Sequence, residues 1–228
     1  MLSRVYGGYM LRALRQCSCL IVFLVLNLSG MAQQQQSSSA DQIWNQLAAG
    51  NHRFATGKDA PQDLQAERKS LTKTQHPRVA VLSCSDSRVP PELVFDEGLG
   101  DLFVVRSAGE DVDAISIGSL EYAVEHLGST VIVVMGHQGC GAVTAACSGA
   151  KSESDNLEAV VRPIAPSCAK MDRAKPETLD LAIRDHVHRV SQEILARSEL
   201  LRKAAEEHKI AVIEAYYSLD TGEVTRLH

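Results

Sequence analysis

The sequence predicts an α/β domain with a mainly parallel central sheet flanked by helices. Short runs of apolar, β-branched residues alternate with longer stretches in which apolar residues recur every three or four positions. Three of these short runs are expected to be strands: Val79–Leu82, Leu102–Val105 and Thr130–Met135. The first and the third are almost uninterrupted, as is typical of strands buried on both faces. Parallel strands in one sheet are joined by right-handed crossovers, so we expect a single layered domain over residues 41–228.

The first 32 residues have the composition of a secretory signal peptide. Three arginines precede a short apolar run over residues 19–26, and the small residues Gly30 and Ala32 mark a cleavage site after Ala32. Because the run is too short for a comfortable bilayer span, we expect an exported protein, periplasmic or secreted, with no membrane association after cleavage. The alternative is a chain anchored in the membrane by an uncleaved N-terminal segment.

A polar linker and a helical arm precede the first strand. Residues 33–40 begin with four glutamines and are expected to be a linker without regular structure. A helix is expected over residues 41–57, where Asp41 caps the start, apolar residues around Trp44 form one face and Gly50 ends the first part.

The remaining elements follow from periodicity and from helix-breaking residues. The adjacent Pro90 and Pro91 should stop any helix directly after the first strand. Two further strands are expected, a major one over Ile210–Tyr217 and a short one at Val224. Helices are expected over Asp113–Leu127, from Gly141 to about Gly149, weakly over Leu157–Lys170 with breaks at Pro163 and Pro166, and as one long helix over Glu177–His208.

Two of the buried strands end in residues that bind metals. The first ends in Cys84, followed closely by Asp86 and Arg88, and the third is followed by His137 and Cys140, spaced so that one turn can aim both at one point. The carboxyl ends of parallel strands lie at one edge of the sheet, so these side chains should share a crevice. Two cysteines and a histidine with an open fourth position are typical of catalytic zinc, whereas structural zinc sites usually have four protein ligands.

These motifs carry a resemblance to a known family. Cys84-Ser-Asp-Ser-Arg88 together with Gly136-His-Gln-Gly-Cys140 resembles the β-class carbonic anhydrases, and the similarity, which includes Asp101–Arg106 and Glu121–Val124, covers about residues 41–222. The resemblance implies one Zn²⁺ per subunit and the reversible hydration of carbon dioxide to bicarbonate and a proton. It also implies a homodimer or a larger homo-oligomer with active sites near the seam between subunits. In that family the N-terminal helices lie across a partner subunit; the alternative here is a helix packed on its own domain.

The acid and the base after Cys84 are expected to be catalytic. Asp86 can accept a hydrogen bond from the reacting water and orient it, and Arg88 can hold Asp86 through a bidentate pair. The alternative, a surface ion pair of little energetic value, fits poorly with a position just after a buried strand.

The resemblance also implies four substrate-binding residues. The Gln75 amide would donate to a bicarbonate oxygen, Phe103 and Tyr122 would line a narrow apolar cleft, and the backbone at Gly141 would approach the substrate. Judged from the residues alone, Gln75 is equally well explained as a polar cap on the first strand, and each aromatic residue as part of the core.

Two segments depart from the pattern of that family. Residues 106–110 are Arg-Ser-Ala-Gly-Glu where Arg-Asn-x-Ala-Asn is usual, and Asp185-His-Val187 stands where Asn-Val is common. We expect both to alter packing near the dimer seam without touching a metal ligand. Members inhibited by bicarbonate carry a tryptophan three residues before the first cysteine. Val81 stands there instead, which predicts the open form with Asp86 paired to Arg88.

Three functions are compatible with these features. Beside carbon dioxide hydration, the same fold and metal could act on carbon disulfide or carbonyl sulfide, or the chain could be a non-catalytic zinc-binding scaffold. The Asp86–Arg88 pair argues against a scaffold, because a structural zinc site does not need it. A net charge of −5 with no basic tract, and only 4% aromatic residues, argue against a nucleic-acid partner.

Two cysteines outside the signal segment remain after the metal ligands are assigned. In an exported protein, Cys147 and Cys168 could form a disulfide. Cysteine is also a common buried apolar residue, and we favour this unpaired state.

Overall fold

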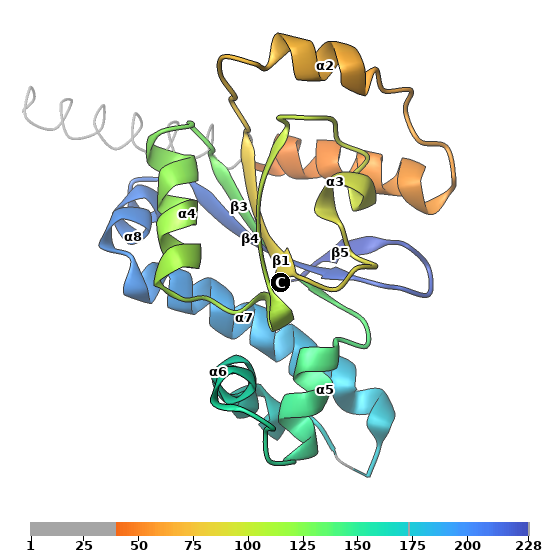
Figure 1. Ribbon diagram of the computed structural model, residues 1–228, viewed down its shortest axis with the longest axis vertical. Helices are drawn as coiled ribbons and strands as arrows, with labels where there is room; N and C mark the ends of the chain where they lie inside the picture. Colours follow the sequence, from red (N-terminus) through yellow and green to blue (C-terminus); the bar gives the residue numbers. More distant parts are fainter. Residues whose placement is uncertain (1–39, 173, 228) are drawn as a thin grey trace, which may run out of the picture. The chain divides into compact units, whose positions relative to one another are not determined.

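A five-stranded sheet forms the centre of the protein (Figure 1). The computed structural model describes residues 40–172 and 174–227, so the expected signal peptide, and the linker up to residue 39, lie outside the described residues. The strand order is β2-β1-β3-β4-β5. Four strands are parallel and the last is antiparallel to β4, which confirms the predicted fold class. They are β1 (Val79–Cys84), β2 (Leu102–Ser107), β3 (Val131–His137), β4 (Ala211–Tyr217) and β5 (Val224–Arg226).

Both faces of the sheet are covered, which explains why its central strands are apolar throughout. Every residue of β1 and β3 is buried. Alternate residues of β1 face opposite sides: Ala80 and Leu82 pack against one layer of helices, and Val79 and Val81 against the other. The first layer consists of α4 (Ala114–Glu125), α7 (Leu179–Arg197) and α8 (Glu199–Glu206). The second layer includes the helix over residues 40–55 and α3 (Pro91–Val94).

The N-terminal helix packs on its own domain. Trp44 and Leu47 are buried in the core. The buried Asn51 side chain ties the helix to two distant segments: it donates to the Val94 carbonyl at 3.0 Å and accepts from the Val224 amide at 2.7 Å. Ala40, expected in the linker, is already helical and buried.

Several expected boundaries were wrong. The first helix continues through Gly50, where a Cβ would lie 1.9 Å from the Phe95 carbonyl oxygen, so this glycine permits close packing and does not end the helix. Pro91 begins α3, because proline is well tolerated at the first position of a helix. The long C-terminal helix is divided at Ser198, whose hydroxyl accepts from the Leu201 amide at 3.0 Å and caps α8.

Several smaller elements lie outside the two helical layers. The segment after the arm contains α2 (Leu64–Ser70), which buries no residue. The other elements are α5 (Gly141–Ser148), α6 (Asp155–Ile164) and the 3₁₀ segment η2 (Ala165–Lys170). Pro163 lies inside α6, so the expected break comes one residue later, after Ile164.

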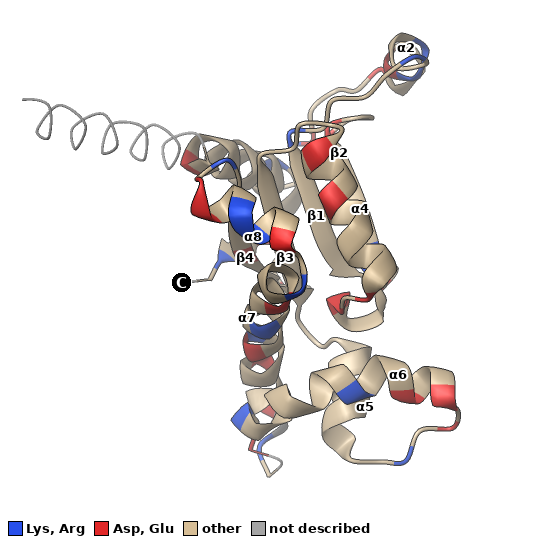
Figure 2. Cartoon of the chain, turned by 90° about the vertical axis from the view of Figure 1, so that its left-hand side faces the viewer, with Lys and Arg blue, Asp and Glu red and all other residues tan. Residues whose placement is uncertain are grey.

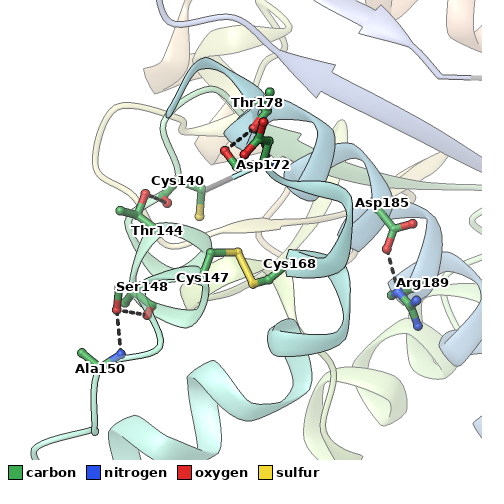
Figure 3. The surroundings of a disulfide bond; sticks show 11 residues. Cys140, Thr144, Cys147, Ser148, Ala150, Cys168, Asp172, Thr178, Asp185 and Arg189 are labelled. Atoms are coloured by element: carbon green, nitrogen blue, oxygen red, sulfur yellow. Dashed lines mark hydrogen bonds and ion pairs between the residues drawn. A yellow bond between two sulfur atoms is a disulfide. The ribbon is translucent and has the colours of Figure 1, made fainter. Parts of the chain in front are cut away.

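A disulfide joins α5 to η2, which corrects the expectation of two unpaired cysteines. Cys147 and Cys168 are bonded, with their Cα atoms 5.1 Å apart (Figure 3). The two elements pack against one another and bring the Cα atoms within the range that a disulfide requires. The two cysteines are 21 residues apart in the sequence, so no local pattern could indicate that they lie together.

The outer surface of α7 and α8 carries charges of both signs (Figure 2). Arginine and acid pairs recur four residues apart, including Arg189–Asp185 and Arg202–Glu206. Such exposed pairs contribute little to stability and mark a solvated face. Within the part of the chain that the structure describes, no helix has the length and apolar character needed to cross a bilayer.

Candidate active site

Three buried side chains converge at the carboxyl edge of the sheet. Cys84 ends β1, His137 ends the neighbouring strand β3, and Cys140 directly precedes α5. Their candidate ligand atoms all lie within 4.8 Å of one another, and the two sulfur atoms are 3.9 Å apart. The sequence predicted this grouping because Cys84 and His137 lie at the ends of two strands that must run parallel to each other, and Cys140 comes three residues after His137.

The donor atoms of this cluster fit zinc. Two thiolates at about 2.3 Å from one tetrahedral zinc ion would lie about 3.8 Å apart, close to the observed separation of the sulfur atoms. The Nδ1 atom of His137 lies 3.0 Å from the Gln138 carbonyl oxygen, and its Nε2 atom is buried without a hydrogen-bond partner. A buried unpartnered nitrogen beside two sulfurs is the arrangement that a zinc ligand set requires.

The two thiols differ in their readiness to ionise. A hydrogen bond from Cys140, with a further one from the Gly109 amide, lowers the pKa of Cys84 far below its ordinary value. The hydrogen bond to Cys84, together with burial, raises the pKa of Cys140. The metal-free pair therefore keeps a proton between its two sulfurs, and metal binding must displace that proton.

Asp86 and Arg88 form a bidentate pair beside the cluster. Arg88 donates from Nε to Oδ1 at 2.9 Å and from its terminal nitrogen to Oδ2 at 2.7 Å. These bonds hold the pKa of Asp86 well below its usual range. Asp86 Oδ2 lies 3.9 Å from His137 Nε2, so the pair borders the candidate ligand atoms while the carboxylate stays engaged with Arg88.

Arg106 and Gly109 hold the segment that contains Cys84 in place. These contacts were not predicted from the sequence. Arg106 donates to the backbone carbonyls of Cys84 at 2.9 Å and of Asp86 at 2.6 Å. The Gly109 amide donates to Cys84 Sγ at 3.3 Å, which corrects the expectation that the unusual 106–110 segment touches no ligand. The only signal in the sequence was a glycine, which here has a positive φ of 75°.

The two segments that depart from the family pattern contact each other. His186 Nε2 lies 2.8 Å from the Gly109 carbonyl oxygen, and because that oxygen only accepts, the histidine donates. Glu110 follows with a φ of 43° and is fully buried, with neither carboxyl oxygen hydrogen-bonded. Burial raises the pKa of Glu110 well above its ordinary value.

The four expected substrate-binding residues do not gather around the cluster within one chain. Gly141 adjoins Cys140 at the start of α5. Gln75 is exposed before the amino end of β1. Phe103 is paired with Ala80, whereas Cys84 is paired with Ser107, so Phe103 lies about 13 Å back along the strands. Tyr122 stays beside Phe103, with ring centroids 6.2 Å apart.

The fold, and a cluster whose donor atoms fit zinc, define a protein of the β-carbonic anhydrase class. The family model described as carbonic anhydrase matches residues 79–224. "Carbonic anhydrase 2" of Mycobacterium tuberculosis is 37% identical over 183 residues, which are 78% of this chain and 88% of the relative. The carbonic anhydrase of Mycolicibacterium smegmatis is 36% identical over 185 residues, 79% and 90% of the two chains.

Solved structures agree on the fold. The β-carbonic anhydrase CafA of Aspergillus fumigatus superposes with a TM-score of 0.64 at 24% identity, covering 72% of this chain and 82% of that one. One of the tetrameric β-carbonic anhydrases of Sordaria macrospora gives 0.64 at 23% identity, covering 84% and 94%. The chain belongs to the carbonic anhydrase family, and its reaction is the reversible hydration of carbon dioxide to bicarbonate and a proton.

Proposed function

We propose that this chain is an exported, homodimeric carbonic anhydrase that holds one zinc ion per subunit through Cys84, His137 and Cys140. The buried cluster of two sulfurs and an unpartnered imidazole nitrogen, next to the Asp86–Arg88 pair, carries the proposal. When bound, zinc supplies a Lewis acid that lowers the pKa of a coordinated water to about 7.

Asp86 orients the reacting water and does not serve as its base. A carboxylate whose pKa lies well below its usual range stays ionised at neutral pH and is a poor proton acceptor. Arg88 donates two bonds to Oδ1, from Nε and from its backbone amide, and one to Oδ2, so Oδ2 keeps a lone pair that can accept a hydrogen bond from water. The proton released in the reaction must therefore leave to solvent or buffer.

A second subunit would complete the substrate cleft. β2 is an edge strand, half-buried over most of its length, with no strand on its outer side among the described residues. Two copies related by a twofold axis can pair along this edge only in antiparallel fashion. Such pairing brings the amino end of one β2, with Phe103 and the adjoining Tyr122, beside the carboxyl end of the other, where Ser107 is paired with Cys84.

Export agrees with the cysteine chemistry of the folded chain. Disulfides persist in oxidising compartments, and Cys147–Cys168 is a disulfide between two packed elements. The mature chain should begin near Gln33. Mass spectrometry of extracytoplasmic protein tests this, and intact Met1 on cytoplasmic protein would contradict it.

Stopped-flow measurement of carbon dioxide hydration tests the activity. We expect catalysis that a zinc chelator abolishes and added zinc restores. Parallel assays with carbon disulfide and carbonyl sulfide should give much slower turnover. Full activity in metal-free protein, or faster turnover of either sulfur compound, would contradict the proposal.

Sedimentation at assay concentration should show a dimer or a larger assembly, and a fully active monomer would argue against the shared cleft.

A further inference from the structure

Gln138, which directly follows His137, is held by the turn between β4 and β5. Its side-chain nitrogen donates to Asp220 Oδ2 at 2.7 Å. Its side-chain oxygen accepts from the Asp220 amide at 3.1 Å and from the Ser218 hydroxyl at 3.2 Å. Its own amide donates to the Tyr217 carbonyl at 2.8 Å, so both the backbone and the side chain of Gln138 are anchored to this turn.

The Gln138 carbonyl sets the tautomer of His137. The oxygen lies 3.0 Å from His137 Nδ1, and because a carbonyl only accepts, Nδ1 must carry the proton. The Nε2 atom is then left with a lone pair, and it is the buried nitrogen that lacks a partner beside the two cysteines. A histidine ligand needs this division between a donating and a coordinating nitrogen.

The peptide that carries this carbonyl joins Gln138 to a glycine. It leads into Gly139, which has a positive φ of 63° and no atom within 4 Å of where its Cβ would stand. Glycine adopts this left-handed conformation at little cost, and Gln138 itself is held by its amide bond to Tyr217 and by the bonds of its side chain.

We propose that Gln138 and Asp220 are positioning residues for the zinc ligand His137. Asp220 fixes the Gln138 side chain, the Gln138 carbonyl fixes the proton on His137 Nδ1, and His137 Nε2 is presented to the metal in its coordinating form. The inference rests on the proposed function only in taking zinc as the metal.

Three variants test this inference by zinc affinity. Asp220→Ala removes the acceptor of Gln138, while Asp220→Asn keeps an oxygen that can accept the same bond. Thr221→Ala is the matched control, since it removes a 3.2 Å bond from the Glu223 amide within the same turn without touching Gln138. In competition with a chromogenic chelator, Asp220→Ala should bind zinc about 10- to 100-fold more weakly, and the other two within about twofold of wild type.

The tautomer of His137 in metal-free protein gives a second readout. Nitrogen-15 NMR, assigned by comparison with His137→Gln, should show protonated Nδ1 in wild type and Asp220→Asn, and a tautomer mixture in Asp220→Ala. Unchanged tautomer and affinity in Asp220→Ala would overturn the inference, as would an equal loss in Thr221→Ala, which would indicate general loosening of the turn. Wild-type protein that binds no zinc would contradict the proposed function instead, while the tautomer comparison would still decide the role of Asp220.

Discussion

The part of the chain that the structure describes contains two pairs of cysteines joined by one short helix, and the two pairs have opposite chemistry. Cys140 directly precedes α5 and faces Cys84 with 3.9 Å between sulfurs and no bond. Cys147, in the last turn of the same helix, is bonded to Cys168 of η2. Cys84, Cys140 and Cys147 are all buried, so burial does not distinguish the pairs.

The surroundings of the sulfurs distinguish them. The Cys84 sulfur accepts a bond from the Gly109 amide, and the buried His137 nitrogen lies within reach of both thiols. The Gly109 donor favours the thiolate form of Cys84, which is the form that binds metals. The Cys147–Cys168 pair instead bridges two packed elements at a Cα separation suited to a disulfide. One pair is therefore arranged to hold a metal and the other to hold two segments together.

Replacing a ligand should have the largest effect. Cys140→Ser substitutes a neutral hydroxyl for a thiolate and should lose most of the bound zinc. Loss of an outer partner of a ligand already costs about 10- to 100-fold in affinity, so loss of the ligand itself should exceed that. Metal analysis of purified protein measures this, with Cys147→Ser as the control that removes a sulfur from the other pair. Full zinc occupancy in Cys140→Ser would show the ligand assignment to be wrong.

Replacing Arg88, which lies beside the candidate zinc ligands, should abolish most activity while leaving zinc in place. Arg88→Ala frees Asp86 from its bidentate partner, so the carboxylate can turn toward the metal, and turnover should fall by about 10³-fold. Without Arg88, an Asp86 carboxylate that is off the metal has a pKa nearer its ordinary value, so the residual activity should be lost at a higher pH during acidification than in wild type. Zinc content and pH–rate profiles of both proteins check this, and unchanged turnover would exclude a role for the pair.

Breaking the disulfide should affect stability and spare the metal. The double variant Cys147→Ser, Cys168→Ser reopens a loop between positions 21 apart, and a closed loop of this size contributes about 3 kcal/mol. Urea unfolding should show this loss, while zinc content stays at the wild-type level. A thiol reductant should destabilise wild type by a similar amount and leave the double variant unchanged. Loss of zinc in the double variant would mean that the two pairs are not independent.

The smallest effect is expected from replacing Glu110, which adjoins the metal-binding pair of cysteines through Gly109. Its pKa is raised in the folded state, so above the unfolded value near 4.5 the folded protein binds one more proton than the unfolded chain. Its contribution to stability therefore falls as pH rises from 4.5 toward the folded pKa. In metal-free protein, Glu110→Gln should melt higher than wild type at pH 8 and nearly equally at pH 4.

A surface variant supplies the control for this last prediction. Glu206→Gln changes an exposed member of an ion pair and should show little difference from wild type at either pH. A melting difference for Glu110→Gln that does not depend on pH would contradict the raised pKa.

Short-range patterns in the sequence are sufficient to define the strands and the candidate ligands. Uninterrupted apolar runs specify strands covered on both faces, and Cys84 and His137 lie at the ends of two such runs. Parallel strands align their carboxyl ends, so residues 53 positions apart in the chain can be placed together from these patterns alone.

The contacts that surround those ligands depend on tertiary packing. The Cys147–Cys168 bond, the Gly109 amide on Cys84 and the hold of Asp220 on Gln138 join segments 21, 25 and 82 residues apart. Each depends on how loops and helices pack on the sheet, where a shift of a few ångströms makes or breaks a hydrogen bond. Periodicity reports which face of an element is buried, but it carries no information on which side chain lies opposite.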